Sequence, residues 1–182
     1  MKPRHQETQG TNGTRGRMDQ NEVQDEIVDW LRDAYAMERG LEGALKKQSE
    51  NNDASPTVRE RARMHLEETR QHAEAVRAAL QSLGTDTSTL KTGMGMMAQT
   101  AKGAATMFAR DEEIKDLLDS YSMEHFEIAC YTALAAAAER AGLNQIAETC
   151  RTIIRDEERM AQTILKALPQ EIGMYLSEHA KA

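Results

Sequence analysis

The chain has 182 residues, of which 30 are acidic and 23 basic, and its formal net charge is −7. This length suits one domain with a hydrophobic core, and the acidic balance without a clustered basic face argues against binding to DNA or RNA. No stretch approaches the roughly 20 apolar residues of a membrane-spanning helix, and the polar N-terminus lacks the apolar segment of a secretory signal.

Two amphipathic helices are expected in the first half of the chain. They follow a polar, glycine-containing stretch at residues 1–20, which we expect to be a disordered tail. The first helix is predicted over about 21–49, where apolar residues recur at the i, i+3, i+4, i+7 spacing. Ser55 followed by Pro56 is a typical helix start, and Gly84 is a typical residue after a helix end.

The second half of the chain is predicted to hold two further long helices. Residues 85–110 contain three glycines and four methionines, so we expect a long crossover with a short helix there. The third long helix is expected over 111–142. The fourth should begin near Asn144 and end before Pro169, because proline removes a backbone donor from a helix. A short helix or tail over 169–182 should complete the chain.

These elements predict an all-α, ferritin-like four-helix bundle over residues 21–168. Each hairpin would pair antiparallel helices of about 25 to 30 residues, or roughly 40 Å at 1.5 Å per residue. Two hairpins joined by one long crossover are the ferritin-like arrangement. Cys130 and Cys150 have no metal-binding spacing and lie among apolar helical residues. Buried, reduced thiols indicate a reducing, cytoplasmic setting.

An internal repeat links the two predicted hairpins. Residues 33–38 and 119–124 share four of six identities, and both segments end in glutamate. Glu68 and Glu157 follow the two segments at nearly the same distance. A pseudo-two-fold axis would therefore bring these four glutamates into symmetric positions.

Several carboxylates occupy positions where a core is expected. Glu38, Glu124 and Glu157 each lie within the apolar stripe of their helix. A buried carboxylate without a partner costs several kcal/mol, so three of them need a shared compensating charge. The alternatives are a salt bridge from Glu38 to Arg39 or to a lysine of a neighbouring helix, and a helix rotation that replaces Glu157 by Glu158.

The second and third helices add further polar residues to this seam. His65 and His72 lie on the apolar stripe of the second helix, and Glu68 lies at its edge. Glu127 follows Glu124 by one turn. Carboxylates bridge paired cations, and imidazole suits iron, manganese or zinc. His65 and His125 are further candidates, and for His72 the alternative is a seam histidine with satisfied hydrogen bonds. The predicted metal ligands are Glu38, Glu68, His72, Glu124, Glu127 and Glu157.

Three motifs resemble the YciE/YciF family of bacterial ferritin-like stress proteins over about residues 22–168. They are Asp33-x-Tyr35-x-x-Glu38, His65-Leu66-Glu67-Glu68-Thr69 and Glu124-His125-Phe126-Glu127-Ile128-Ala129-x-Tyr131. The resemblance implies a homodimer with a rubrerythrin-like dimetal site, most often di-iron, and a link to stress. Carried over by position, it implies a ligand set of Glu38, Glu68, Glu124, Glu127 and Glu157.

The wider di-iron pattern, E-x-x-H on the second and fourth helices, is not met. Glu68 is followed by Gln71 at i+3 and His72 at i+4, and Glu157 by Met160 and Ala161. The first hypothesis is thus a metal-binding stress protein that oxidises Fe(II) with oxygen or peroxide, with manganese or zinc as other metals. The second is a non-catalytic dimeric bundle that acts through protein–protein interaction. The third is a carrier whose methionine-rich crossover binds a partner.

Overall fold

The computed structural model describes residues 19–52, 54–87 and 112–179. Within these ranges the chain is helical and contains no strand. The expected tail before residue 19 lies outside the described residues. So does most of the expected crossover, including its methionines and the short helix that the sequence predicts there. The described helices are α1 (Gln20–Ser49), α2 (Pro56–Ser82), α4 (Glu112–Arg140) and α5 (Asn144–His179).

The first two helices begin where side chains satisfy their free backbone donors. The Asp19 carboxylate accepts hydrogen bonds from the backbone N–H groups of Asn21 and Glu22, both at 2.9 Å. In return, the Glu22 carboxylate accepts from the Asp19 N–H at 2.8 Å, which completes a capping box. Ser55 caps α2, and Pro56 occupies its first turn, as the sequence predicts.

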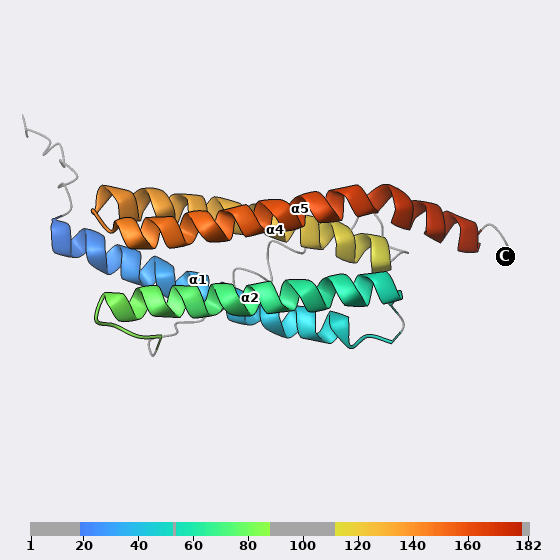
Figure 1. The fold of residues 1–182 in the computed structure, drawn as a ribbon, viewed down its shortest axis with the longest axis horizontal. Coiled ribbons are helices and arrows are strands. Elements are labelled where there is room, and N and C mark those ends of the chain that lie inside the picture. The colour runs from blue at the N-terminus through green and yellow to red at the C-terminus, as the bar shows by residue number, and fades with distance from the viewer. Residues whose placement is uncertain (1–18, 53, 88–111, 180–182) are drawn as a thin grey trace, which may run out of the picture.

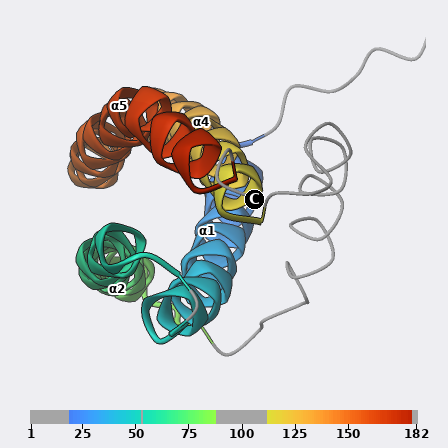
Figure 2. The ribbon, with the colours of Figure 1, turned by 90° about the vertical axis from the view of Figure 1, so that its right-hand side faces the viewer.

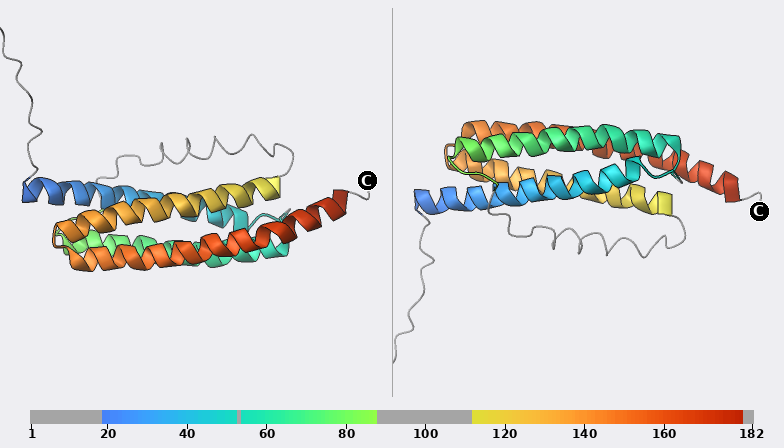
Figure 3. Two further views of the ribbon diagram at one scale, coloured as in Figure 1. Left: turned by 90° about the horizontal axis from the view of Figure 1, so that it is seen from above. Right: turned by 90° about the horizontal axis from the view of Figure 1, so that it is seen from below.

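The four helices form two antiparallel hairpins, which confirms the ferritin-like bundle. α1 packs along α2, and α4 packs along α5 (Figures 1 and 2). The views from above and below show α1 beside α4 and α2 beside α5 (Figure 3). α2 ends at one end of the bundle and α4 begins at the other, which is the geometry of a bundle with one crossover.

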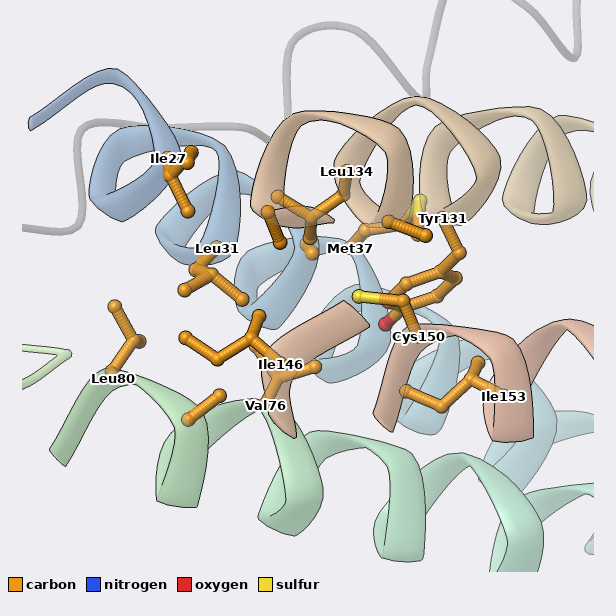
Figure 4. Close-up of a cluster of buried hydrophobic side chains, with 14 of the residues drawn as sticks. Ile27, Leu31, Met37, Val76, Leu80, Tyr131, Leu134, Ile146, Cys150 and Ile153 are labelled. Atoms are coloured by element: carbon orange, nitrogen blue, oxygen red, sulfur yellow. The ribbon is translucent and has the colours of Figure 1, made fainter. Parts of the chain in front are cut away.

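The apolar core is divided into two clusters along the bundle axis. The larger cluster includes Ile27, Leu31, Leu80 and Ile153 and draws on all four helices (Figure 4). The smaller cluster joins α4 to α5 through Leu117, Met160 and Ile164. On α5, Glu157 lies between Ile153 of the larger cluster and Met160 of the smaller one, so on this helix a polar layer lies between the two clusters.

The fourth helix is longer than expected, and the prediction that it ends before Pro169 is wrong. α5 continues through Pro169 to His179 and extends past the rest of the bundle (Figure 1). Proline withdraws one helical hydrogen bond, but Pro169 and Leu165, whose carbonyl loses that bond, lie on an exposed face. Beyond the proline, buried Glu171 pairs with Arg61 of α2 at 3.1 Å and holds the extension against the bundle.

Both cysteines are free, and neither is fully accessible. Cys150 is buried and Cys130 is half-buried. Burial raises the pKa of the Cys150 thiol to about 11 and also raises the pKa of Cys130. Both thiols are therefore protonated at neutral pH, as expected of packing residues. None of the described helices combines the length and apolar character needed to cross a membrane.

The α4–α5 turn depends on glycine at position 142. Gly142 has φ +76°, its N–H donates to the Glu139 carbonyl, and the Leu143 N–H donates to the Ala138 carbonyl at 2.8 Å. This is a Schellman motif, which requires a left-handed residue. We expect Gly142→Ala to lower the free energy of unfolding by about 1 to 2 kcal/mol, as measured by urea denaturation.

The matched control is Gly43→Ala, in the middle of α1. No atom lies within 4 Å of an added Cβ at either glycine, so only backbone conformation differs between the two substitutions. Gly43 is helical, and alanine there should stabilise the protein by about 0.5 to 1 kcal/mol. Equal effects of the two substitutions would contradict this account of the turn.

Candidate metal centre

The polar layer between the apolar clusters consists of carboxylates and imidazoles from all four helices. The glutamates are 0 to 1% exposed and the histidines 5%. One glutamate comes from α1, two from α4 and one from α5, while α2 supplies both histidines. The residues are Glu38, Glu124, Glu127, Glu157, His65 and His72.

These six side chains form two overlapping groups whose ligand atoms lie close enough together to hold a metal ion. The first group contains His65, Glu124, Glu127 and Glu157. The second contains Glu38, His72 and Glu157. Within each group, one ligand atom per residue lies within 4.8 Å of all the others. Glu157 belongs to both groups, so the two groups share one carboxylate.

The polar atoms of this cluster fit a cation better than they fit one another. Within the described part of the chain, both carboxylate oxygens of Glu124 and Glu127 are buried without a hydrogen-bond partner, and so are Oε2 of Glu38 and Oε1 of Glu157. Native proteins rarely leave buried polar atoms unpaired, because each costs about 1 to 3 kcal/mol. A divalent cation would satisfy several of these oxygens at once.

Without a cation, the carboxylates of α4 retain their protons. Burial, with the nearby Glu157 carboxylate, raises the pKa of Glu124 to about 10. Burial and the same neighbour raise the pKa of Glu127 well above its usual range. Burial raises the pKa of Glu38 to about 7, although His72 and Tyr131 favour its ionised form. The metal-free cluster therefore stores protons that a metal must displace.

The ionised members of the cluster are Glu157 and His72. Burial lowers the pKa of His72, but the contacts with Glu157 and Glu38 outweigh it and raise this pKa to about 9. For Glu157, the contacts with His72 and Glu124 outweigh burial and lower the pKa. His72 Nδ1 lies 2.9 Å from Glu157 Oε1, close enough for an ion pair though not aligned for a hydrogen bond. Burial lowers the pKa of His65, which stays neutral.

Tyr131 of α4 holds the α1 glutamate in place. Its fully buried hydroxyl donates to Oε1 of Glu38 at 2.5 Å, and Oε2 has no hydrogen-bond partner in the described part of the chain. Figure 4 shows the Tyr131 ring near Met37, Cys150 and Ile153. Tyr35 and Tyr121 lie one turn before Glu38 and Glu124, respectively. They pack against the apolar clusters.

The structure does not bring the predicted ligand Glu68 into either group. Its side chain is 28% exposed and pairs with Arg159 of α5 at 2.7 Å. The inward line of α2 runs through His65, Thr69 and His72, so Thr69, at 1% exposed, takes the position that the repeat predicts for Glu68. The partly exposed Glu68 carboxylate, paired with Arg159, keeps part of its hydration. Burial in the layer would remove that hydration.

The sequence left open whether Glu157 or Glu158 faces the cluster and whether His125 does. The rotation of α5 and of α4 about their axes decides both. Glu157 faces the cluster, whereas Glu158 is exposed. His125 is exposed and lies edge-on to Tyr121, with ring centroids 4.6 Å apart. The structure also brings His65 into the first group, and its place on the α2 stripe, four residues before Thr69, is the sequence feature that indicates it.

A surface groove reaches the first group. It has a volume of about 1000 Å³ and lies between the C-terminal half of α1 and the N-terminal half of α4. Lys46 and Lys115 line it near the surface, and His65 and Glu124 line it where it meets the cluster. The groove does not touch Glu38 or His72, so the two groups differ in access as well as in composition.

Comparison with known families places most of the chain in one family. The model of a family described as a domain of unknown function, DUF892, matches residues 22–177. This match includes all four described helices except the ends of α1 and α5, and the whole polar layer.

Solved structures share the fold. A protein from Xanthomonas campestris is 30% identical, with a TM-score of 0.72 over 87% of this chain and 98% of that chain. The E. coli stress protein YciF is 21% identical, with a TM-score of 0.70 over 83% and 97%. YcfI from Rhodopseudomonas palustris is 24% identical, with a TM-score of 0.66 over 83% and 96%. The last two similarities show the fold alone.

The stability of the metal-free protein should fall as pH rises from 6.5 to 8.5. Over this range folded Glu124, with a pKa of about 10, and folded His72, with a pKa of about 9, hold protons that the unfolded chain has largely released. The folded state then binds more protons, so the free energy of unfolding decreases by at least about 1 kcal/mol per pH unit. Urea denaturation in the presence of EDTA measures this slope.

The variant Glu124→Gln provides the control for this slope. It keeps the size of the side chain and removes the titrating carboxyl, so its stability should depend less steeply on pH. A wild-type midpoint that does not change between the two pH values would show that the cluster does not store these protons.

Proposed function

The chain belongs to the DUF892 family, that of the YciE/YciF proteins, and on this basis we propose that it is a metal-binding stress-response protein. Its bundle would hold two divalent cations, with iron as the first choice and manganese or zinc as the others. The observation that carries the proposal is the pair of ligand groups that share Glu157. Their oxygen and imidazole donors suit these metals.

The chain's own residues would perform distinct tasks at such a centre. Glu157 would bridge the two cation positions, and Tyr131 would fix the orientation of Glu38 through its hydrogen bond. The apolar clusters on both sides exclude water from the layer. Glu124 and Glu127 would give up their carboxyl protons as cations bind, which makes the affinity for metal increase with pH.

A small oxidant is the substrate that the site suits best. We propose that oxygen or peroxide reaches the layer through the α1–α4 groove, which ends at His65 and Glu124. A pair of iron ions, when bound, supplies the electrons that reduce such a molecule. The residues of the layer keep bulk water out and hold the ligand carboxylates at fixed positions.

A second candidate is a non-catalytic dimer, and one feature of α5 favours it. Leu165, Ile172 and Leu176 lie seven and four residues apart, on one face of the helix, and are 41 to 59% exposed. Exposed apolar faces of this kind are used for association. In this candidate two copies of the chain pair through α5, in a cytoplasm that keeps both cysteines reduced.

Metal titration of Glu157→Gln tests the metal proposal. The wild-type protein should bind about two equivalents of Fe(II) under anaerobic conditions. Loss of the shared carboxylate should abolish binding at one position or both, as measured by calorimetry and by metal analysis after gel filtration. The matched control is Glu158→Gln, since Glu158 is the exposed neighbour on the same turn. A wild-type chain that binds no Fe(II), Mn(II) or Zn(II) would refute the proposal.

Oxidation of the bound Fe(II) separates the two candidates. An oxidase or peroxidase should convert Fe(II) to Fe(III) faster than free Fe(II) in the same buffer, when oxygen or hydrogen peroxide is added. We expect Glu124→Gln to slow this conversion by about tenfold or more. If the metal-loaded protein consumes neither oxidant and sedimentation shows a dimer that Leu176→Lys disrupts, the non-catalytic candidate is supported instead.

A further inference from the structure

The two nitrogens of the His72 ring face different environments. Nδ1 points into the polar layer, 2.9 Å from Glu157 Oε1 and 4.0 Å from Glu38 Oε1. Nε2 points away from both, toward Asp156 Oδ2 at 3.3 Å. Asp156 is 28% exposed and belongs to neither ligand group. His72 therefore connects the buried cluster to a carboxylate near the surface.

Asp156 is held by a second set of contacts. Arg159 Nη1 donates to Asp156 Oδ1 at 2.8 Å, and Arg159 Nη2 donates to Glu68 Oε1 at 2.7 Å. Glu68 and His72 lie four residues apart on α2, and Asp156 and Arg159 lie three residues apart on α5. Three contacts, His72–Asp156, Asp156–Arg159 and Arg159–Glu68, join the four side chains, and the turn of α2 between Glu68 and His72 closes the ring. We call this set of residues, Glu68, His72, Asp156 and Arg159, the α2–α5 ring.

We propose that Asp156, Arg159 and Glu68 are positioning residues that orient His72 toward the cation position it shares with Glu38 and Glu157. This inference rests on the proposed metal function. The Asp156 carboxylate accepts the Nε2 proton, which leaves the lone pair of Nδ1 free to bind a cation. Arg159 fixes the Asp156 carboxylate, and Glu68 fixes the Arg159 guanidinium.

The other histidine has a different environment. His65 Nδ1 lies 3.5 Å from Glu124 Oε1, and its Nε2 lies 3.8 Å from Glu157 Oε2. Both partners are candidate ligands, and His65 Nε2 has no hydrogen-bond partner in the described part of the chain. The α2–α5 ring therefore orients one histidine and not the other. Its loss should weaken only one of the two cation positions.

The α2–α5 ring also accounts for the glutamate that α2 places outside the cluster. Glu68 and His65 stand in the motif His65-Leu66-Glu67-Glu68-Thr69. His65 faces the cluster, whereas Glu68 faces Arg159. A carboxylate at this position would act on the metal through Arg159, Asp156 and His72, not as a ligand itself.

Titration of Asp156→Asn with Mn(II) tests the positioning role. We expect the wild-type protein to bind two equivalents, and the variant to bind one of them about 10- to 100-fold more weakly while the other is unchanged. Glu68→Gln should weaken the same equivalent by a smaller factor. The matched control is Asp29→Asn, which removes another aspartate paired with an arginine three residues along the helix. It should leave both equivalents unchanged.

A second measurement uses the metal-free protein and does not depend on the metal function. Near pH 7, where His72 carries a proton on each ring nitrogen, the Nε2–H proton should give a downfield, slowly exchanging NMR signal in the wild-type protein, because the Asp156 carboxylate accepts it. In Asp156→Asn this signal should move upfield and exchange faster, because an amide oxygen is a weaker acceptor than a carboxylate. Asp29→Asn should show the wild-type pattern.

The outcomes distinguish the positioning role from the metal function. Equal weakening of both equivalents, no weakening, or an unchanged His72 Nε2–H signal in Asp156→Asn would overturn the positioning role. A wild-type protein that binds no Mn(II), Fe(II) or Zn(II) but shows the change of the Nε2–H signal in Asp156→Asn would overturn the metal function and leave the orientation of His72 by Asp156 standing.

Discussion

Burial of four carboxylates in one layer of the bundle is the constraint on which the rest of the structure depends. Removing a carboxylate from water costs several kcal/mol unless a proton, a cation or hydrogen bonds compensate. Without metal, protons on Glu124 and Glu127 and the positive charge of His72 compensate. Such a layer lowers the stability of the metal-free protein, and a bound cation would recover the cost. The layer is therefore better explained by a function that needs buried carboxylates than by the packing of the core.

The halves of the molecule are similar in sequence, but the layer is not symmetric. The repeat places Glu38 and Glu124 at equivalent points of α1 and α4, and both are fully buried. α5 contributes Glu157 to the layer, whereas α2 contributes Thr69 between two histidines. Glu157, the carboxylate that both ligand groups share, therefore has no carboxylate counterpart on the inward stripe of α2. The two candidate cation positions consequently differ in their ligands, in their access to the groove and in the support of their histidine.

The conflict between the repeat and the rotation of α2 has a physical cause. Ala62, His65, Thr69, His72 and Val76 follow one helical stripe, and α2 buries that stripe against the bundle. Glu68 lies to one side of it, where Arg159 is within reach. Turning Glu68 inward would bury another carboxylate and would turn the two histidines away from the layer. The observed rotation costs less because buried His65 and Thr69 are neutral, buried His72 is paired with Glu157, and the Glu68 carboxylate stays partly hydrated.

The sequence by itself determined the helices, their order and the positions of Glu38, Glu124 and Glu157, because helical periodicity shows which carboxylates lie on an apolar stripe. Glu127 was indicated by its place one turn after Glu124. The chain past Pro169 could not be predicted in the same way. A proline on an exposed face costs one hydrogen bond, and only the distant Arg61–Glu171 pair decides whether the helix continues. Likewise, only the tertiary structure decided the place of Glu68, Tyr131 and Asp156. Their partners lie on other helices, dozens of residues away, and no local pattern specifies which side chains meet across a bundle.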